Sequence, residues 1–520
     1  MSAATGLSRI TGLAREMVMA RLFGASAAYD AFLLGFRIPN LARDLFAEGA
    51  LSSAFVPTFA QVLERKGKRE AAELSNLVAT ALFLVVGGIC ALGMIFSPEL
   101  VKLLAPGFAK VPGKFELATL LTRIMFPFLA LVALAAQAMG VLNACGRFGV
   151  PALASAFFNI GSVAFGLGLG YTAGRRFGQG MIVSMACGVV AGGALQLLWQ
   201  IPSLRRAGFA YRPRLDFSHA GLRQIGRLML PAVLGNAALQ INVVVNTNLA
   251  SNIVDAAGHV IDGPVSWLGY AFRFMQLPLG LFGVAMASAT LPAISRSAAL
   301  GRIDEFRDTL AHSLGMVLLL TVPSSVGLAA LGESMIAAVY QQGRFHAYDT
   351  HRTAVALACY SVGLAGYSAT KILAPAFYAL NDARTPMLVS VSSIGVNLAA
   401  APALVKWAGM GHAGLALSTS LAALAGAASL FALLRRRIGG IHGGRLARSA
   451  AKIAAASAIM GAACLASSHA IHAWAGAGKL GQLVDVAVSI PLGAAVFYFS
   501  ARAFGIEELE TLRLALRPKA

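Results

Sequence analysis

Charged residues are scarce in this 520-residue chain: Asp, Glu, Lys and Arg make up only 12% of it, whereas 58% is hydrophobic. Acidic residues are the scarcest, with 22 Asp and Glu against 42 Lys and Arg. Soluble globular domains carry about 25% charged residues, so this composition excludes that class. The mean hydropathy of +0.72 indicates an integral membrane protein.

Metal-binding and redox motifs are also lacking. The five cysteines stand singly, mostly inside apolar runs, and we interpret them as small core residues. The nine histidines show no HExxH or paired spacing. We therefore expect no metal site, no cofactor and no catalytic residue. A secretory signal is not expected either, because Arg9, Arg15 and Glu16 interrupt the apolar stretch that it needs.

Long apolar runs dominate what is present. They are near or above the roughly 20 residues that cross a bilayer as a helix, and no ten-residue alternation typical of barrel strands dominates. The sequence therefore predicts an all-α polytopic membrane protein with fourteen transmembrane helices. The expected spans are residues 3–24, 27–60, 73–105, 115–145, 150–172, 179–202, 224–253, 264–296, 307–338, 352–380, 385–407, 411–435, 447–470 and 481–504.

An even number of spans places both termini on one side of the membrane. The loops on that side hold most of the Lys and Arg, including residues 64–70, 204–214 and 433–448. Because basic loops stay inside, we expect both termini in the cytoplasm. Basic residues at the inner surface face anionic lipids, which explains the formal charge of +20 without nucleic acid.

The two halves of the chain repeat each other. Residues 141–153 resemble 378–388, residues 197–208 resemble 429–440, and Pro39 corresponds to Pro278, all at an offset of about 235 residues. Six spans separate equivalent positions, so the two six-helix lobes have the same orientation. Parallel lobes around a central cavity are typical of transporters, although a structural scaffold can also be duplicated.

The repeat predicts four regions. They are an N-terminal lobe (1–203), a cytoplasmic interfacial linker (204–223), a C-terminal lobe (224–438), and two extra helices with a tail (439–520).

Charged residues gather in the first two spans: Arg9, Arg15, Glu16, Arg21, Asp30, Arg37, Arg43, Asp44 and Glu48. An Arg at the bilayer centre costs about 2.5 to 3.5 kcal/mol on insertion scales, so these side chains should face protein or a wet cavity. One interpretation pairs them with each other, as Arg15 or Arg43 with Asp30 or Glu48. The other assigns the positive excess to an anionic substrate, because guanidinium groups bind phosphate bidentately.

The second lobe has deep cations of its own. Arg273 is the lone charge well inside the eighth span, and Lys371 lies in the tenth. Lys371 is equally well interpreted as a lysine that reaches toward the membrane surface.

Four long stretches carry a family resemblance: residues 8–16 (SRITGLARE), 30–57, 265–285 and 371–386 (KILAPAFYALNDARTP). They resemble the MurJ/MviN lipid II flippases of bacteria, which belong to the superfamily of multidrug, oligosaccharidyl-lipid and polysaccharide exporters. The resemblance implies two six-helix lobes plus two C-terminal helices. It also implies transport of lipid II, the undecaprenyl-diphosphate-linked peptidoglycan precursor, to the outer leaflet of the cytoplasmic membrane by alternating access.

The resemblance also implies which residues matter. The expected substrate-binding residues are Arg9, Arg15, Arg43, Arg273, Asn40 and Ser266, with Lys371 as a further candidate. The acidic residues expected in the cavity or in coupling are Asp30, Glu48 and Glu16. Many relatives have an aspartate just before the Arg273 position, whereas this chain has Phe272, which puts an ion-pair role there in doubt.

Coupling to the membrane potential, to H⁺ or to Na⁺ stays open, and the lipid tail is expected in a groove beside residues 447–504. The expected partners are lipid II, membrane lipids and the cell-wall synthesis machinery.

Two rival functions remain. A cation-coupled drug exporter or polysaccharide-lipid exporter of the same superfamily is one, but cationic drugs need an acidic cavity and these spans are net basic. A membrane glycosyltransferase is the other, but it needs catalytic carboxylates, and the outer loops carry only scattered acids such as Asp255, Asp262 and Asp349.

Overall fold

The computed structural model describes residues 2–44, 51–173, 180–216, 218–255, 257–476 and 478–516. Within these ranges the regular elements are helices, and the only β-type pairing is an isolated bridge between Val254 and Val260. Contacts divide the chain into unit 1 (Met1–Val265) and unit 2 (Ser266–Ala520). The all-α prediction is confirmed.

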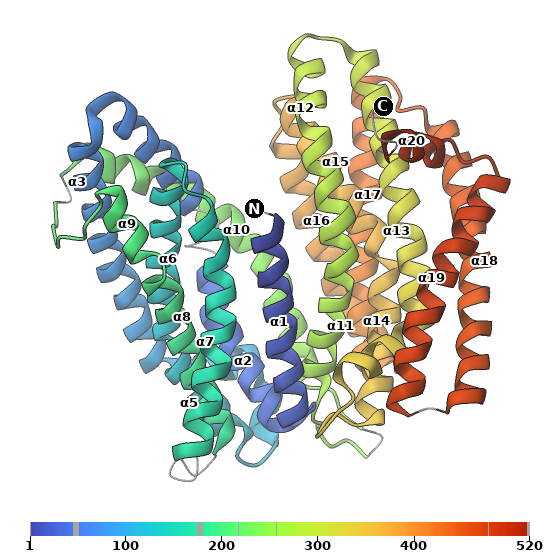
Figure 1. Ribbon diagram of the computed structural model, residues 1–520, viewed down its shortest axis with the longest axis horizontal. Helices are drawn as coiled ribbons and strands as arrows, with labels where there is room; N and C mark the ends of the chain where they lie inside the picture. Colours follow the sequence, from blue (N-terminus) through green and yellow to red (C-terminus); the bar gives the residue numbers. More distant parts are fainter. Residues whose placement is uncertain are drawn as a thin grey trace. The chain divides into compact units, whose positions relative to one another are not determined.

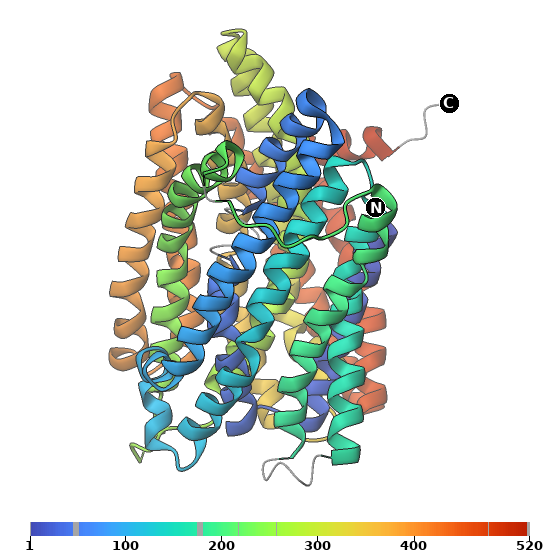
Figure 2. The ribbon, with the colours of Figure 1, turned by 90° about the vertical axis from the view of Figure 1, so that its left-hand side faces the viewer.

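Unit 1 is a bundle of roughly aligned helices, drawn from blue to green in Figure 1 and facing the viewer in Figure 2. Its elements are α1 (Ser2–Phe23), α2 (Ala27–Arg43), α3 (Ser52–Ile95), α4 (Ser97–Leu104), the 3₁₀ helix η2 (Pro106–Lys110), α5 (Lys114–Met125), α6 (Pro127–Ala144), α7 (Gly149–Ala173), α8 (Met181–Leu198), α9 (Ile201–Ala207) and α10 (Ala220–Ser251).

Unit 2 is built around α13, which packs against α12, α14, α15, α18, α19 and α20. Its elements are α11 (Pro264–Pro278, beginning at the division), the π-helix η4 (Leu279–Val284), α12 (Ala285–Ala299), α13 (Ile303–Tyr340), α14 (Ala347–Val362), α15 (Leu364–Ala379), α16 (Arg384–Pro402), the π-helix η5 (Ala403–Trp407), α17 (Gly411–Ile438), α18 (Gly443–Ala475), α19 (Lys479–Ala503) and α20 (Glu507–Leu516).

Ten helical stretches among the described residues are long and apolar enough to cross a membrane. Each of the fourteen expected spans overlaps a helix. However, α1, α2, α10 and the α14–α15 pair are not among the ten stretches that are long and apolar enough to cross a membrane. For three of these stretches the reason is local: α1 carries four charged residues, and α2, α14 and α15 have only 17, 16 and 16 residues. The protein is multi-pass, and the count of fourteen stays a prediction.

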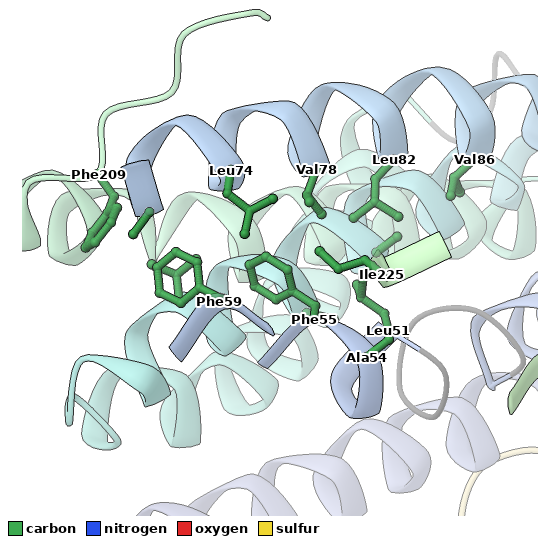
Figure 3. Close-up of a cluster of buried hydrophobic side chains, with 14 of the residues drawn as sticks. Leu51, Ala54, Phe55, Phe59, Leu74, Val78, Leu82, Val86, Phe209 and Ile225 are labelled. Carbon is green, nitrogen blue, oxygen red and sulfur yellow. The ribbon is translucent and has the colours of Figure 1, made fainter. Parts of the chain in front are cut away.

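The expected loop between residues 60 and 73 is helical instead. Its Glu, Lys and Arg residues favour helix, and the chain reverses at Gly67, whose φ of 83° suits glycine. The two arms of α3 then face one another, with Phe55 and Phe59 packed toward Leu74 and Val78 (Figure 3). The chain therefore makes a tight turn at Gly67 where the sequence predicts a long loop.

Local geometry at one pair of turns agrees with the predicted internal repeat. The turn after α6 has Gly146 at φ 72°, and the turn after α15 has Asn381 at φ 56°, 235 positions later. In both turns the next amide donates to the carbonyl five residues earlier over 2.9 Å, which is a Schellman-type helix end. The helices before these turns are also both interrupted, at Phe126 and at Gly363.

Small residues bring α7 and α8 into close contact in unit 1. An added Cβ at Gly188 would lie 2.3 Å from the carbonyl oxygen of Ser162, and one at Gly192 would lie 2.6 Å from that of Phe158. Membrane helices associate in this way because burial of apolar side chains gives little advantage within lipid.

The expected linker is attached to unit 1. After α9 the chain is extended, and the backbone amides of Arg212 and Arg214 donate to Asn76 (3.2 Å) and Thr80 (3.3 Å) of α3. Helix α10, which the sequence grouped with the C-terminal lobe, also packs on α3. The four-region division itself stays a prediction.

Candidate functional site

Arg15 is held between aromatic rings of two neighbouring helices. Its guanidinium carbon lies 5.8 Å from the ring centre of Phe36 on α2 and 5.3 Å from that of Phe158 on α7. It also lies 3.7 Å from the carboxylate of Glu16, which is buried. The cation–π contacts fix the height and direction of the positive charge in unit 1. Arg9, two turns earlier on α1, is exposed.

Arg43 ends α2 and pairs with its neighbour Asp44, with Nη2 3.0 Å and Nε 3.3 Å from Oδ1. One turn earlier, the buried side-chain oxygen of Asn40 has no hydrogen-bond partner in the described part of the chain. Glu48 lies outside the described residues. This end of α2 therefore presents a cation and an amide oxygen that is open to a donor.

Asp30 belongs to a buried charge cluster that the sequence did not reveal. The ammonium of Lys114, at the start of α5, lies 2.9 Å from Asp30 and 2.7 Å from Asp262. The backbone amide of Gly263 also donates to Asp30 over 2.8 Å, and the Phe108 ring lies 4.3 Å from the ammonium. Lys114 and Asp30 are both buried. Asp30 thus accepts two hydrogen bonds and has a cation beside it.

One of the pairs expected from sequence, Asp30 with Arg43, is not formed. Asp30 begins α2 and Arg43 ends it, so they lie about 20 Å apart at 1.5 Å per residue and cannot meet. Arg15 lies 3.7 Å from Glu16 and Arg43 lies 3.0 Å from Asp44, whereas the expected pairs with Glu48 fall outside the described residues. Glu16, Asp30 and Asp44 nevertheless lie beside cations, as expected if these charges hold helices together.

Arg37, on the middle of α2, donates to the hydroxyl of Thr247 on α10 over 2.7 Å. This bond ties two helices that are 210 residues apart in the chain. Arg37 therefore has a packing role in unit 1, which agrees with its exclusion from the candidate set.

In unit 2, Arg273 is exposed on α11, and Ser266 is fully buried near the start of the same helix. Phe272, which stands where many relatives have an acid, packs edge to face on Tyr360 of α14 at 5.5 Å. A ring in that position anchors α11 to α14 and supplies no negative charge to Arg273. Lys371 is exposed on α15.

Unit 2 also contains an apolar groove of about 420 Å³. Its walls come from η4, α13, α18 and α19, and they include Phe282, Leu328, Met335, Met460 and Phe497. The family resemblance implies a lipid-tail groove beside residues 447–504, and α18 and α19 in this range form part of the walls. Lining of this kind suits a hydrocarbon chain.

No group of three or more His, Cys, Asp or Glu side chains is placed to hold a metal ion in the ranges that the structure describes. The candidate side chains are thus arginines, amides, hydroxyls and carboxylates, which bind anionic and polar groups.

Comparison with known proteins adds independent information. Residues 19–482 match the family model described as "Lipid II flippase MurJ". The chain is 34% identical to a probable lipid II flippase MurJ of Haemophilus influenzae, covering 82% of this chain and 83% of that protein. It is also 34% identical to the lipid II flippase MurJ of Burkholderia cenocepacia, over 84% and 83% of the two chains.

Solved structures agree. A lipid II flippase MurJ in an inward closed conformation matches with a TM-score of 0.76 and 25% identity, over 96% of this chain and 98% of the other. An inward-facing multidrug transporter of the MATE family matches with a TM-score of 0.68 and 17% identity, over 83% and 94%. The second likeness shows a shared fold.

Proposed function

The chain belongs to the MurJ family of lipid II flippases, and from this premise we propose that it moves lipid II across the bacterial cytoplasmic membrane by alternating access. The observation that carries the proposal is the family match over residues 19–482. The protein is a transporter, so its residues bind and release the substrate without changing it chemically.

The diphosphate of lipid II is the group that arginines recognise. We assign it to Arg9, Arg15 and Arg43 of unit 1 and to Arg273 of unit 2. Guanidinium groups form bidentate, charge-assisted hydrogen bonds with phosphate oxygens, and they stay charged in apolar surroundings. The rings of Phe36 and Phe158 that hold Arg15 support this role, because they orient the cation without neutralising it. Asn40 and Ser266 then serve as polar contacts for the headgroup.

The undecaprenyl tail requires an apolar surface of its own. We assign the groove between η4, α13, α18 and α19 to a section of this tail. Hydrocarbon burial there contributes about 0.8 kcal/mol per CH₂ group relative to water, so the tail is more stable in the groove than in a hydrated space. The headgroup and the tail therefore follow separate paths.

The membrane potential is the driving force that these side chains favour. Moving negative charge outward gains about 2.3 kcal/mol per charge per 100 mV when the cell interior is negative. Proton or Na⁺ coupling through Asp30 is less favoured, because Lys114 and the Gly263 amide both bind its Oδ2 and stabilise the charged carboxylate. Glu16 and Glu48 stay as alternative coupling residues.

The orientation rests on charge. In unit 2 the end of α17 carries Arg435, Arg436 and Arg437, and the start of α18 adds Arg445 and Arg448. Such basic helix ends stay on the cytoplasmic side. We therefore place both termini in the cytoplasm, with membrane lipids and the cell-wall synthesis machinery as neighbours.

Reconstitution tests the assignment. Purified protein in liposomes, with fluorescent lipid II and an imposed potential, should translocate lipid II, and Arg15→Ala and Arg273→Ala should lose most of this activity. Arg21→Ala is a matched control, because Arg21 is exposed at the last turn of α1 outside the candidate set. Full activity in both Arg15→Ala and Arg273→Ala would remove the arginines from the mechanism.

A further inference from the structure

A polar cluster lies inside unit 2 where α13, α18 and α19 meet. Asp485 of α19 is fully buried and accepts hydrogen bonds from Ser334 of α13, from Ser468 of α18 (2.6 Å) and from Ser489 of α19 (2.6 Å). His472 of α18 places Nε2 3.2 Å from the same carboxylate. One carboxylate thus joins three helices.

The polar contacts continue along one face of α19. One turn and a half before Asp485, the ammonium of Lys479 donates to the carbonyls of Ala337 (3.0 Å) and Ala338 (2.7 Å) near the end of α13. Between them, Gln482 donates to Gln341 over 3.2 Å. The last carbonyls of a helix lack partners within it, so Lys479 caps α13 with a positive charge.

This cluster borders the apolar groove. On α13, Ser334 stands between the groove residues Leu331 and Met335. On α18, Ser468 follows the groove residue Cys464 by one turn, and on α19 Ser489 directly precedes the groove residue Ile490. The groove therefore lies next to the cluster, toward the α20 end of these helices, and each helix passes from a cluster residue to a groove residue within one turn.

Breaking the hydrogen bonds of this cluster costs free energy. A carboxylate in apolar surroundings is stable only while its oxygens are hydrogen-bonded, and each serine hydroxyl has a single proton to give. Asp485 uses the protons of three serines from three helices. A hydrocarbon chain cannot replace these donors, so it stops where the cluster begins.

We propose that Asp485, with Ser334, Ser468 and Ser489, forms the closed end of the groove and thereby sets how much of a prenyl chain the groove accepts. Asp485 is a positioning residue in this account, because it acts through the helices that it joins. The inference rests on the proposed function, since it concerns the tail of the transported lipid.

Transport of two substrates tests the proposal. Liposomes containing wild-type protein receive lipid II with an undecaprenyl tail or an analogue with a heptaprenyl tail, and the ratio of the two transport rates is measured. Wild type should discriminate between the tails. Asp485→Leu and Ser468→Ala should lose this discrimination. Without the complete polar cluster, the prenyl chain can extend beyond the present end of the groove. A loss of packing alone would slow both substrates equally and leave the ratio unchanged.

Two variants serve as controls. Ser457→Ala removes a fully buried serine from the same helix α18, but that hydroxyl donates to the backbone of its own helix, so the ratio should stay at the wild-type value. Ser334→Asp with Asp485→Ser moves the carboxylate across the same hydrogen bond and should retain the discrimination. Ser468→Ala keeps two of the three donors, which guards against a variant that fails to fold.

The possible results are distinct. Wild type that transports neither lipid contradicts the proposed function itself. Wild type that transports both tails equally, or variants that all keep the wild-type ratio, overturn the closed end while the flippase assignment stands.

Discussion

Replacement of Lys114 by Met tests the buried charge cluster of unit 1 most sharply. Met keeps most of the length and apolar volume of the side chain but removes the ammonium that faces Asp30 and Asp262. The side chains of Lys114 and Asp30 are each only 1% exposed, so the change leaves a carboxylate in the interior that keeps the hydrogen bond from the Gly263 amide but loses the cation.

The magnitude follows from burial. Removing one partner of a buried ion pair costs about 3 to 5 kcal/mol, because the other charge loses its compensation. The Asp262 side chain is 41% exposed, so Asp262→Asn should cost no more than about 1 kcal/mol, as for surface pairs. Lys114→Met combined with Asp30→Asn should recover much of the loss, because the stranded charge is gone.

The assay is denaturant unfolding of the purified protein in detergent, with a double-mutant cycle over Lys114 and Asp30. A large coupling between these two positions and a small one between Lys114 and Asp262 are expected. Equal costs for Lys114→Met and Asp262→Asn, or a cost below about 1 kcal/mol for Lys114→Met, would refute the reasoning.

Three further outcomes follow from the described contacts. Arg37→Ala removes the bond to Thr247 and should lower the free energy of unfolding by about 1 kcal/mol while transport per folded molecule stays unchanged. Gly188→Leu should prevent α7 and α8 from packing, since even a Cβ there would lie 2.3 Å from a carbonyl oxygen, and the yield of folded protein checks this. Hydrogen bonds from the amide and hydroxyl of Thr385 lower the pKa of Asp382, in the turn before α16. Its contribution to stability is therefore present above the pKa of the unfolded chain and is lost as pH falls through the folded pKa, so Asp382→Asn should flatten the acid limb of unfolding curves.

Much of the fold follows from sequence because a membrane span has a fixed length and an apolar composition. The similarity of residues 141–153 and 378–388 also predicted a shared turn, and Gly146 and Asn381 indeed have positive φ there. The turn at Gly67 was not, because Glu, Lys and Arg around it suggest a solvated loop as readily as a helix. In the structure these residues form helix on both sides of Gly67, in line with their helix propensity.

The candidate site was predictable only in part. The resemblance implies Arg15 and Arg273, but the contacts of Arg15 with the rings of Phe36 and Phe158 come from helix packing that spacing does not encode. Lys114 was missed because it looks like a lysine at the edge of an apolar run, and its partners are 84 and 148 residues away. Asp485 was missed for the same reason, since its donors Ser334 and Ser468 come from two other helices.

Leaflet-resolved labelling of lipid II tests the central claim most directly. Bacteria depleted of their own lipid II flippase and supplied with this protein should show lipid II in the outer leaflet, where an external enzyme or label can reach it. The same cells with Arg15→Ala should keep lipid II in the inner leaflet. Lipid II that stays inside with the folded wild-type protein present would contradict the account.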